Sequence, residues 1–376
     1  MPRTDEILRA QRKLLSGKIS QEAFDELIEN ETKKVVDMQV EEGVDYITSG
    51  ELGRDNYVSF ISQALDGVEL MSMSQMLDYV SDKKSFEQIL DTLDVPAMAI
   101  KNAICTGKIS RRSGMATKEL TTLKKFTDKK VKITLPGPYL VTRSMWLPEL
   151  SKKGYDSKEE LGEDVIKIFT EEIKDLQEIG VDIIQFDEPV LTEVVFTEGR
   201  PRTFMCAALS ERKDPTEELE FASYLISSVM SKVDRQKSKP ALHVCRGNWS
   251  KDESILLEGP YTPLLKVFKE ADPEILFLEF STERAGELSS YFEEDAMKDK
   301  ILGLGVVNPR LDDVESVDFI VDKVKSALKF TSPDKLMINP DCGFATFANR
   351  PVNSYDIIRK KLKAMKAAKE ILCQSV

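Results

Sequence analysis

The stretch Val181-Asp182-Ile183-Ile184-Gln185-Phe186-Asp187-Glu188-Pro189 decides the fold class of this chain. It is a short apolar run that ends on two acidic residues and a proline, as is typical of a buried parallel strand. Residues 157–180, directly before it, carry apolar side chains at helical spacing, open with the capping-box pair Ser157 and Glu160, and stop at Gly180. The predicted structural unit is therefore a helix followed by a buried strand.

The same unit recurs along the chain. The periodic residues 22–42 lead into Gly43-Val44-Asp45-Tyr46-Ile47-Thr48-Ser49-Gly50-Glu51, a second run that ends on an acid. Further strands, most of them joined by helix-length segments such as 312–329, are predicted at residues 131–135, 240–245, 275–280, 301–307 and 335–339. Alternating strands and helices favour a parallel sheet, and seven well-spaced units favour a (β/α)8 TIM-type barrel over a doubly wound sheet.

Two stretches do not fit the repeat. Residues 57–113 are rich in Ser, Met and Asp, and residues 195–239 are mostly polar, so both are predicted to be insertions. Neither stretch has the low complexity or the Pro and Gly content of a linker. Residues 1–376 are therefore predicted to form a single α/β barrel domain with these two insertions.

Composition limits the classes of partner. The chain has 376 residues, 41% of them hydrophobic, and a net charge of −12. That charge makes nucleic acid or an anionic membrane an unsuitable partner for a large surface. The N-terminus lacks the apolar region of a secretory signal, no run of about eighteen apolar residues occurs, and the five cysteines lack the spacing of a disulfide scaffold. We therefore predict a cytoplasmic protein with reduced thiols.

The only histidine of the chain lies in His243-Val244-Cys245, at the end of an apolar run. Residues i and i+2 of a strand point to the same face, so His243 and Cys245 can bind one ion together. Glu279 lies near the end of one predicted strand and Cys342 just past another, and the C-terminal ends of barrel strands converge on one mouth. Two sulfurs, one imidazole and one carboxylate suit tetrahedral Zn²⁺, which we predict to be bound by these four residues.

A zinc-bound thiolate stays deprotonated near neutral pH and keeps its nucleophilicity, so this ligand set predicts the alkylation of a substrate thiol. The incoming sulfur needs a coordination position, and we expect either that the carboxylate of Glu279 leaves or that the coordination expands. Two alternatives are open at this point. One is a closed zinc site that only stabilises the fold, and the other is a His243 that is hydrogen-bonded in a core without any metal.

Six side chains at the same mouth are predicted to contact substrate: Glu51, Arg54, Trp146, Asp187, Glu188 and Asn308. Glu51 and Asp187 are also the predicted catalytic residues. Asp187 and Glu188 could hold an ammonium group or accept a proton, with a helix cap on the following segment as the alternative role. Glu51 could bind a cationic group and Arg54 an anion, with a solvated salt bridge as the alternative. Trp146 offers a stacking face for a flat heterocycle, or covers the core.

With these motifs in view, the chain resembles the cobalamin-independent methionine synthase family, specifically its catalytic barrel without the extra N-terminal half. The matching segments are Pro2-Arg3-Thr4-Asp5-Glu6, Ser49-Gly50-Glu51 with Arg54, Pro136-Gly137-Pro138 and Gln185-Phe186-Asp187-Glu188-Pro189. Three more occupy the family's zinc-ligand positions in order: His243-Val244-Cys245, Glu279 and Asn339-Pro340-Asp341-Cys342-Gly343. Arg246-Gly247-Asn248 and Glu283-Arg284-Ala285-Gly286 resemble a single-barrel, methionine synthase-like branch.

The resemblance implies that zinc holds the thiolate of homocysteine and that Glu51 and Asp187 recognise its amino group. It also implies that the first barrel strand is missing, is replaced by another segment, or lies upstream of Met1. In the family that strand ends in a Gly-Ser turn that binds the amino-acid carboxylate, whereas this chain begins after the turn, at Met1-Pro2-Arg3.

A second departure concerns the family's catalytic histidine, since Val306-Val307-Asn308-Pro309-Arg310 runs through its expected position. Methyltetrahydrofolate needs protonation at nitrogen to become a leaving group. A methylated corrinoid protein is therefore the simpler methyl donor, and methyltetrahydrofolate is the other.

The predicted function is zinc-dependent methyl transfer to a small thiol, with homocysteine giving methionine. One alternative is thiol alkylation like that of the epoxyalkane coenzyme M transferases, which a mouth with Arg54, Arg246 and Arg310 around the thiol would favour. The other alternative is a non-catalytic zinc protein that binds a partner.

Overall fold

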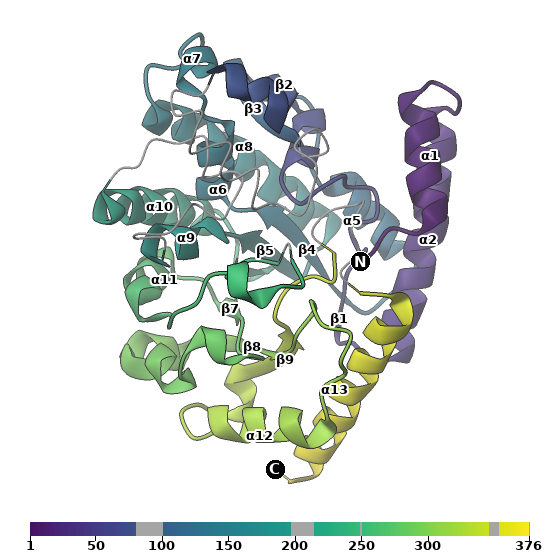
Figure 1. Cartoon of the computed structure of the whole chain (residues 1–376), viewed down its shortest axis with the longest axis vertical. Coiled ribbons are helices and arrows are strands. Elements are labelled where there is room, and N and C mark those ends of the chain that lie inside the picture. The colour runs from purple at the N-terminus through teal and green to yellow at the C-terminus, as the bar shows by residue number, and fades with distance from the viewer. Residues whose placement is uncertain (80–100, 197–213, 249, 346–352, 376) are drawn as a thin grey trace.

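A computed structural model describes residues 1–79, 101–196, 214–248, 250–345 and 353–375. Its centre is a parallel sheet of seven strands in the order β1-β4-β5-β6-β7-β8-β9, with helices around its outside (Figure 1). The strands are β1 (Tyr46–Ile47), β4 (Lys130–Pro136), β5 (Ile183–Asp187), β6 (Lys239–Val244), β7 (Ile275–Leu278), β8 (Ile301–Val307) and β9 (Leu336–Pro340). This parallel strand order confirms the predicted α/β barrel fold.

Helices connect successive strands of this sheet. The α-helices are α1 (Asp5–Leu15), α2 (Gln21–Glu41), α3 (Met73–Met76), α5 (Thr117–Lys124), α6 (Pro138–Met145), α7 (Pro148–Ser151), α8 (Lys158–Ile179), α9 (Val190–Phe196), α10 (Pro215–Met230), α11 (Leu265–Ala271), α12 (Val317–Ala327) and α13 (Tyr355–Ser375). Short 3₁₀ turns are η1 (Ser59–Ala64), η2 (Leu77–Tyr79), η5 (Glu253–Ile255), η6 (Thr262–Leu264), η7 (Glu283–Ala285), η8 (Leu288–Glu293), η9 (Asp295–Asp299) and η10 (Pro333–Lys335).

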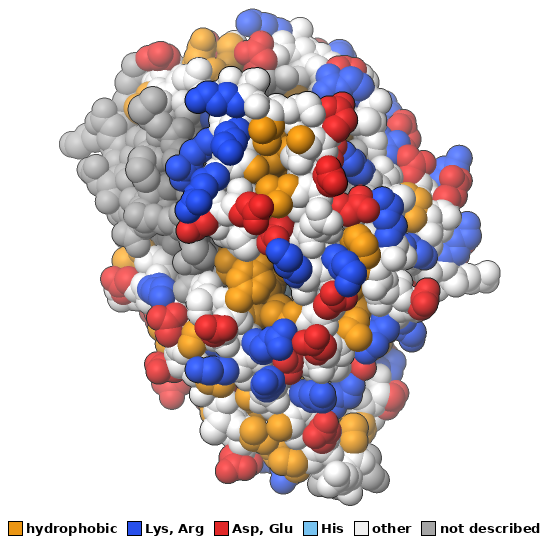
Figure 2. All heavy atoms as spheres, turned by 90° about the vertical axis from the view of Figure 1, so that its right-hand side faces the viewer, with side chains coloured by type: hydrophobic (Ala, Val, Ile, Leu, Met, Phe, Trp, Pro, Cys, Tyr) orange, Lys and Arg blue, Asp and Glu red, His pale blue; other side chains and the backbone are white. Residues whose placement is uncertain are grey.

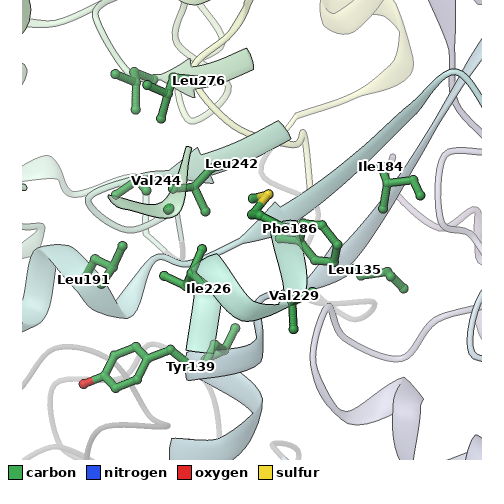
Figure 3. Packing of buried hydrophobic residues seen from close by; sticks show 14 of the residues in the cluster. Leu135, Tyr139, Ile184, Phe186, Leu191, Ile226, Val229, Leu242, Val244 and Leu276 are labelled. Carbon is green, nitrogen blue, oxygen red and sulfur yellow. The ribbon is translucent and has the colours of Figure 1, made fainter. Parts of the chain in front are cut away.

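The unit α8–β5 forms for the reasons visible in its sequence. The Ser157 side chain accepts a hydrogen bond from the Glu160 backbone N–H, and Gly180 ends the helix with a φ of 95°, a left-handed conformation that favours glycine. Along β5, Ile184 and Phe186 face the outer helices and join the main hydrophobic core (Figure 3). The alternate residues, beginning with Ile183 in a separate apolar cluster with residues of β6 and β7, face the barrel interior.

The order of strands leaves the sheet with two edges, β1 and β9. Among the described residues, no hydrogen-bonded ladder joins one edge to the other. All five residues of β9 are partly exposed, whereas β7 is buried throughout. The sheet is therefore open at the place between its last and its first strand.

The two predicted insertions differ in structure. Within residues 57–113, β2 (Leu65–Ser72) and β3 (Lys101–Arg111) form a separate antiparallel pair, and residues 80–100 lie outside the described part. Within residues 195–239, residues 197–213 lie outside it, but α10 is a helix between β5 and β6 that packs against α8 and α11. This second stretch therefore continues the helix–strand repeat through α10 instead of only interrupting it.

Charged side chains of both signs are mixed on the surface. On the face shown in Figure 2, acidic and basic groups alternate, with hydrophobic side chains between them, and neither sign forms a continuous field. Among the described helices, none combines the length and the apolar character needed to cross a bilayer.

Candidate metal centre and active site

Three of the predicted metal ligands meet at the C-terminal ends of the strands. His243 lies near the end of β6, Cys245 follows that strand and Cys342 follows β9. The candidate ligand atoms of these three residues all lie within 4.8 Å of one another. The sheet thus brings together residues that are 97 positions apart, from 245 to 342, as convergence of strand ends at one mouth predicts.

The imidazole of His243 is oriented for a metal. Its Nδ1 lies 2.9 Å from the Phe277 carbonyl oxygen, which can only accept, so Nδ1 carries the proton. The other nitrogen, Nε2, is buried and has no hydrogen-bond partner among the described residues. A buried lone pair of this kind needs a partner, and metal-bound histidines commonly donate their second N–H to a backbone carbonyl in the same way.

The two thiols influence each other. A hydrogen bond from Cys342 lowers the pKa of Cys245 well below its ordinary value, and the same interaction raises the pKa of Cys342. One sulfur of the pair is therefore readily ionised, and a bound cation would stabilise both as thiolates. With the lone pair of His243, this donor set of two sulfurs and one nitrogen fits Zn²⁺.

Glu279, the predicted fourth ligand, lies beside this group but is held by other partners. Its carboxylate accepts hydrogen bonds from the Arg246 backbone N–H at 2.9 Å and from Arg310 Nη1 at 3.3 Å. Burial raises the pKa of Glu279 to about 7, with the Arg310 cation opposing that rise. The group of three ligand atoms within 4.8 Å does not include this carboxylate.

Asp341 is a buried acid to which sequence reasoning gave no role. Its Oδ1 accepts backbone N–H hydrogen bonds from Phe280 at 3.1 Å and Ser281 at 3.0 Å, and its Oδ2 lies 3.6 Å from Arg310. These contacts tie the loop after β7, which carries Glu279, to the loop after β9. Its position directly before Cys342 was the only indication in the sequence.

On the other side of the mouth, Glu51 is fixed by its neighbours. Its carboxylate accepts a hydrogen bond from Thr134 Oγ1 at 2.6 Å and lies 3.3 Å from Arg54 Nη1. Desolvation would raise the pKa of Glu51, but the Arg54 cation and the buried N-terminal amine outweigh it and lower that pKa to about 2. The backbone of Glu51 has a φ of 57°, a strained conformation for this residue that is commonly found at functional sites.

Asp187 is the second acid of the mouth. Its Oδ1 accepts a hydrogen bond from Gln185 Nε2 at 2.7 Å. Burial raises the pKa of Asp187 to about 6, and the neighbouring His243 opposes that rise. The pairing of β5 with β6 places Asp187 opposite His243, so this carboxylate lies next to the metal group.

A cavity of about 1210 Å³ joins the two sides of the mouth. It is lined by Glu51, Asp187, His243, Cys245 and Cys342, and also by Thr134, Gln185 and Lys132 from the inward faces of β4 and β5. The last three were not predicted, although polar residues at every second position of an apolar run indicate an inward face. The cavity continues past both sheet edges, since residues of β1 and β9 line it.

The other predicted contact residues do not line this cavity. Both carboxylate oxygens of Glu188 accept backbone N–H hydrogen bonds at the start of α6, from Tyr139 at 2.8 Å and Leu140 at 2.9 Å. Glu188 therefore caps a helix, but this helix precedes it in the sequence, whereas the predicted cap was on the following segment. A Cβ at Gly137 would lie 2.1 Å from this carboxylate, so the Pro-Gly-Pro motif needs its glycine. Trp146 belongs to the main core and Asn308 donates to Glu253 at 2.7 Å.

The three arginines that would bind a sulfonate are also engaged elsewhere. Arg54 donates to Glu119 at 2.9 Å and to the Thr134 carbonyl at 2.9 Å. Arg246 donates to the Gly259 carbonyl, and Arg310 pairs with Glu253 and Glu279. None of the three is among the residues that line the cavity.

An α/β barrel with a cysteine–histidine group that could bind a metal, and with two acids at its mouth, is typical of metal-binding barrel proteins. Comparison with known families makes the assignment specific: residues 1–370 match the family described as "Cobalamin-independent synthase, Catalytic domain", and the chain belongs to that family. The predicted resemblance is thereby confirmed.

Individual relatives are distant. The chain is 27% identical over 376 residues to the 5-methyltetrahydropteroyltriglutamate–homocysteine methyltransferase of Bacillus licheniformis, covering 100% of this chain but 42% of that protein. It is 26% identical over 342 residues to the methionine synthase of Sulfolobus acidocaldarius, covering 87% of this chain and 78% of that one. The chain thus spans less than half of the longer relative.

Solved structures agree with the fold. A B12-independent methionine synthase from Shewanella sp. W3-18-1, in complex with selenomethionine, superposes with a TM-score of 0.71 at 21% identity, covering 95% of this chain and 91% of that one. A putative vitamin-B12 independent methionine synthase from Listeria monocytogenes gives a TM-score of 0.66 at 21% identity, with coverages of 99% and 95%.

Proposed function

We propose that this protein is a zinc-dependent methyltransferase that methylates the thiol of homocysteine to give methionine. The observation that carries the proposal is the single cavity that places the His243, Cys245 and Cys342 group beside Glu51 and Asp187. Homocysteine combines a thiol with an ammonium group, and this cavity offers a partner for each. The names of the relatives, methionine synthase and homocysteine methyltransferase, support the same acceptor.

In this proposal His243, Cys245 and Cys342 would hold Zn²⁺ together with Glu279, and the metal would offer a site for the substrate sulfur. The bound metal supplies Lewis acidity that keeps the substrate thiol deprotonated near neutral pH. Hydrogen bonds from Arg310 and the Arg246 backbone N–H give the Glu279 carboxylate partners other than the metal. A carboxylate with partners of this kind can leave the metal without becoming an unpaired buried charge.

Glu51 and Asp187 are proposed to bind the ammonium group of homocysteine. The pKa of Glu51 is lowered to about 2, so this residue is ionised throughout the physiological range. Asp187 has a raised pKa of about 6 and is ionised above that pH. Two carboxylates that line one cavity attract and orient an ammonium group, and the oriented thiolate then attacks the methyl carbon of the donor.

The methyl donor is one of two classes. The name of the Bacillus licheniformis relative specifies a methylated folate, and no comparison supports a corrinoid protein. The chain has one histidine, His243, and its place in the metal group leaves no imidazole to protonate a folate nitrogen. Transfer forms a carbon–sulfur bond and breaks the donor's bond to the methyl group, so a folate would still need a proton from another acid or from water.

Coenzyme M is the less suitable acceptor. Its sulfonate would need a cationic partner, and Arg54, Arg246 and Arg310 are committed to protein carboxylates and carbonyls outside the cavity lining. A non-catalytic zinc protein would not need two acids beside an exchangeable metal position.

Methionine formation tests the proposal directly. Zinc-loaded protein is incubated with homocysteine and either methyltetrahydrofolate, its polyglutamate form or methylcobalamin, and methionine is measured by mass spectrometry. We expect methionine with one donor class and none after zinc is removed by chelation, with recovery on adding zinc back. Absence of methionine with every donor, or methionine formation that survives zinc removal, would overturn the proposal.

A further inference from the structure

Lys132 is a lysine inside the barrel that the proposed function does not use. Its Nζ donates a hydrogen bond to Gln185 Oε1 at 2.8 Å and lies 4.4 Å from the centroid of the Phe277 ring. Burial lowers the pKa of Lys132, while Asp187 and Glu51 oppose the effect. Lys132 is half-buried and lines the cavity, where Gln185 and the Phe277 ring are the partners of its ammonium group.

Gln185 connects Lys132 to the mouth of the barrel. Its Nε2 donates to Asp187 Oδ1 at 2.7 Å while its Oε1 accepts from Lys132. An ammonium group can only donate and a carboxylate can only accept, so the two ends of the amide have one orientation. The side chain of Gln185 is buried, and all three residues line the cavity.

Lys132 acts on Asp187 in two ways: through the hydrogen bonds of Gln185 and through direct attraction between the ammonium group and the carboxylate. In the part of the chain that the structure describes, Lys132 forms no ion pair with any carboxylate, whereas Arg54 contacts Glu51 directly. Residues i and i+2 of β5 share a face, so Gln185 lies directly below Asp187 along the strand. Each acid of the mouth therefore has its own support: Arg54 and Thr134 hold Glu51, and Lys132 and Gln185 hold Asp187.

We propose that Lys132 and Gln185 are positioning residues that fix the Asp187 carboxylate in the orientation that receives the ammonium group of an amino-acid thiol. They thereby set a preference for thiols that carry an α-amino group over thiols that lack one. This inference rests on the proposed function, because it assumes that a thiol binds at the metal group. Neither residue contacts the reacting atoms in this account.

The test compares two thiols that differ only in the amino group: homocysteine and 4-mercaptobutyrate. Their binding to zinc-loaded wild type and Lys132→Met is measured by isothermal titration calorimetry, with zinc content determined on the same samples. We expect the Kd of homocysteine to rise about tenfold in the variant, about 1.4 kcal/mol, and the Kd of 4-mercaptobutyrate to change by less than about twofold. Lys132→Arg keeps a donor and should restore part of the selectivity.

The control and a second variant keep the test decisive. Lys130→Met removes the same charge two residues earlier on the same face of β4. The Lys130 Nζ lies 5.6 Å from the Tyr46 ring, outside the hydrogen-bonded chain from Lys132 through Gln185 to Asp187, so this variant should change neither Kd. Gln185→Met removes the hydrogen bonds that connect Lys132 to Asp187 while Lys132 stays. If Lys132→Met does not fold, Gln185→Met should show the same selective loss of homocysteine binding.

Each outcome has a separate meaning. Equal weakening of both thiols, or unchanged homocysteine binding in Lys132→Met and Gln185→Met, would overturn this inference and leave the proposed function standing. Failure of zinc-loaded wild type to bind either thiol would instead overturn the proposed function itself.

Discussion

The two sides of the barrel mouth are built in opposite ways. On the β6 and β9 side, His243 Nε2 is buried without a hydrogen-bond partner in the described structure, beside two thiols that perturb each other's pKa. On the β1 and β5 side, Glu51 and Asp187 each accept a hydrogen bond from a side chain that is itself held in place. The first side presents atoms that could bind a metal, whereas protein contacts complete the second. Metal binding and recognition of the amino group should therefore be separable by mutation.

The largest effect is expected on the metal side. Cys245→Ser or Cys342→Ser removes a soft ligand from a group of three, so zinc binding should fall below stoichiometric and methyl transfer by about 1000-fold or more. Metal content by mass spectrometry and methionine formation measure both effects. Cys373→Ser, at an exposed cysteine, is the control and should keep the metal. Full zinc occupancy in both ligand variants would show that these cysteines are not the metal ligands.

The next largest effect concerns stability on the acid side. Arg54→Met leaves Glu51 and Glu119 without their shared cation, and the loss of one partner from a buried ion pair typically costs about 3–5 kcal/mol. We expect a decrease near the lower end, because Glu119 and Glu51 are partly exposed, measured by urea unfolding. Arg112→Met breaks the exposed pair with Asp66 and should cost less than about 1 kcal/mol. Equal losses in the two variants would contradict the distinction between these ion pairs.

Glu279→Gln tests whether the Glu279 carboxylate is an exchangeable zinc ligand. If Glu279 is an exchangeable ligand held by Arg310, its loss should weaken zinc affinity by about 10–100-fold without abolishing binding. A competition titration with a chelator measures the affinity. Glu253→Gln changes another carboxylate on the same Arg310 and should leave zinc affinity unchanged. Complete metal loss in Glu279→Gln would show instead that zinc binding requires Glu279 as much as it requires the two cysteines.

Asp187→Asn should separate amino-group recognition from metal binding. Because a charge-assisted hydrogen bond to the substrate ammonium is lost, we expect the KM for homocysteine to rise about tenfold with zinc content unchanged. The KM for 4-mercaptobutyrate should stay within about twofold, since that thiol has no ammonium group. A similar rise for both thiols would show that Asp187 acts on the metal side instead.

The smallest expected effect is a pH dependence of thiol selectivity that arises from the Asp187 carboxyl. The raised pKa of Asp187 means that the group is protonated below about pH 6 and loses its attraction for an ammonium group there. The ratio of homocysteine to 4-mercaptobutyrate affinity should therefore fall as the pH drops through about 6, and Asp187→Asn should flatten the profile. The ratio cancels effects of pH on the thiol and on the metal. A flat ratio in the wild type would remove Asp187 from this role.

Sequence reasoning succeeded where periodicity sets structure. The apolar runs and caps predicted β5 and α8 closely, and the strand ends predicted that His243, Cys245 and Cys342 meet. The helix α10 was not predicted because its sixteen residues lie within the longer stretch 195–239, which is mostly polar as a whole. Local composition is a poor guide when one element is short relative to the stretch in which it is judged.

The contacts of individual side chains could not be predicted in this way. A position at a strand end places Glu279 at the mouth, but the arginines that bind its carboxylate come from other loops. Asp187 and Glu188 are adjacent in sequence, yet alternate sides of the strand send one to the cavity and the other to α6. The hydrogen-bonded chain from Lys132 through Gln185 to Asp187 depends on the register of β4 with β5, which no local sequence pattern predicts.

The central claim is that Cys245, Cys342 and His243 hold a zinc ion with a position open to substrate sulfur. Zinc-edge X-ray absorption of the purified protein, before and after addition of homocysteine, measures the number of sulfur ligands directly. We expect stoichiometric zinc with two sulfur ligands that become three when homocysteine is added. Protein without stoichiometric metal, or a sulfur count that homocysteine leaves unchanged, would contradict it.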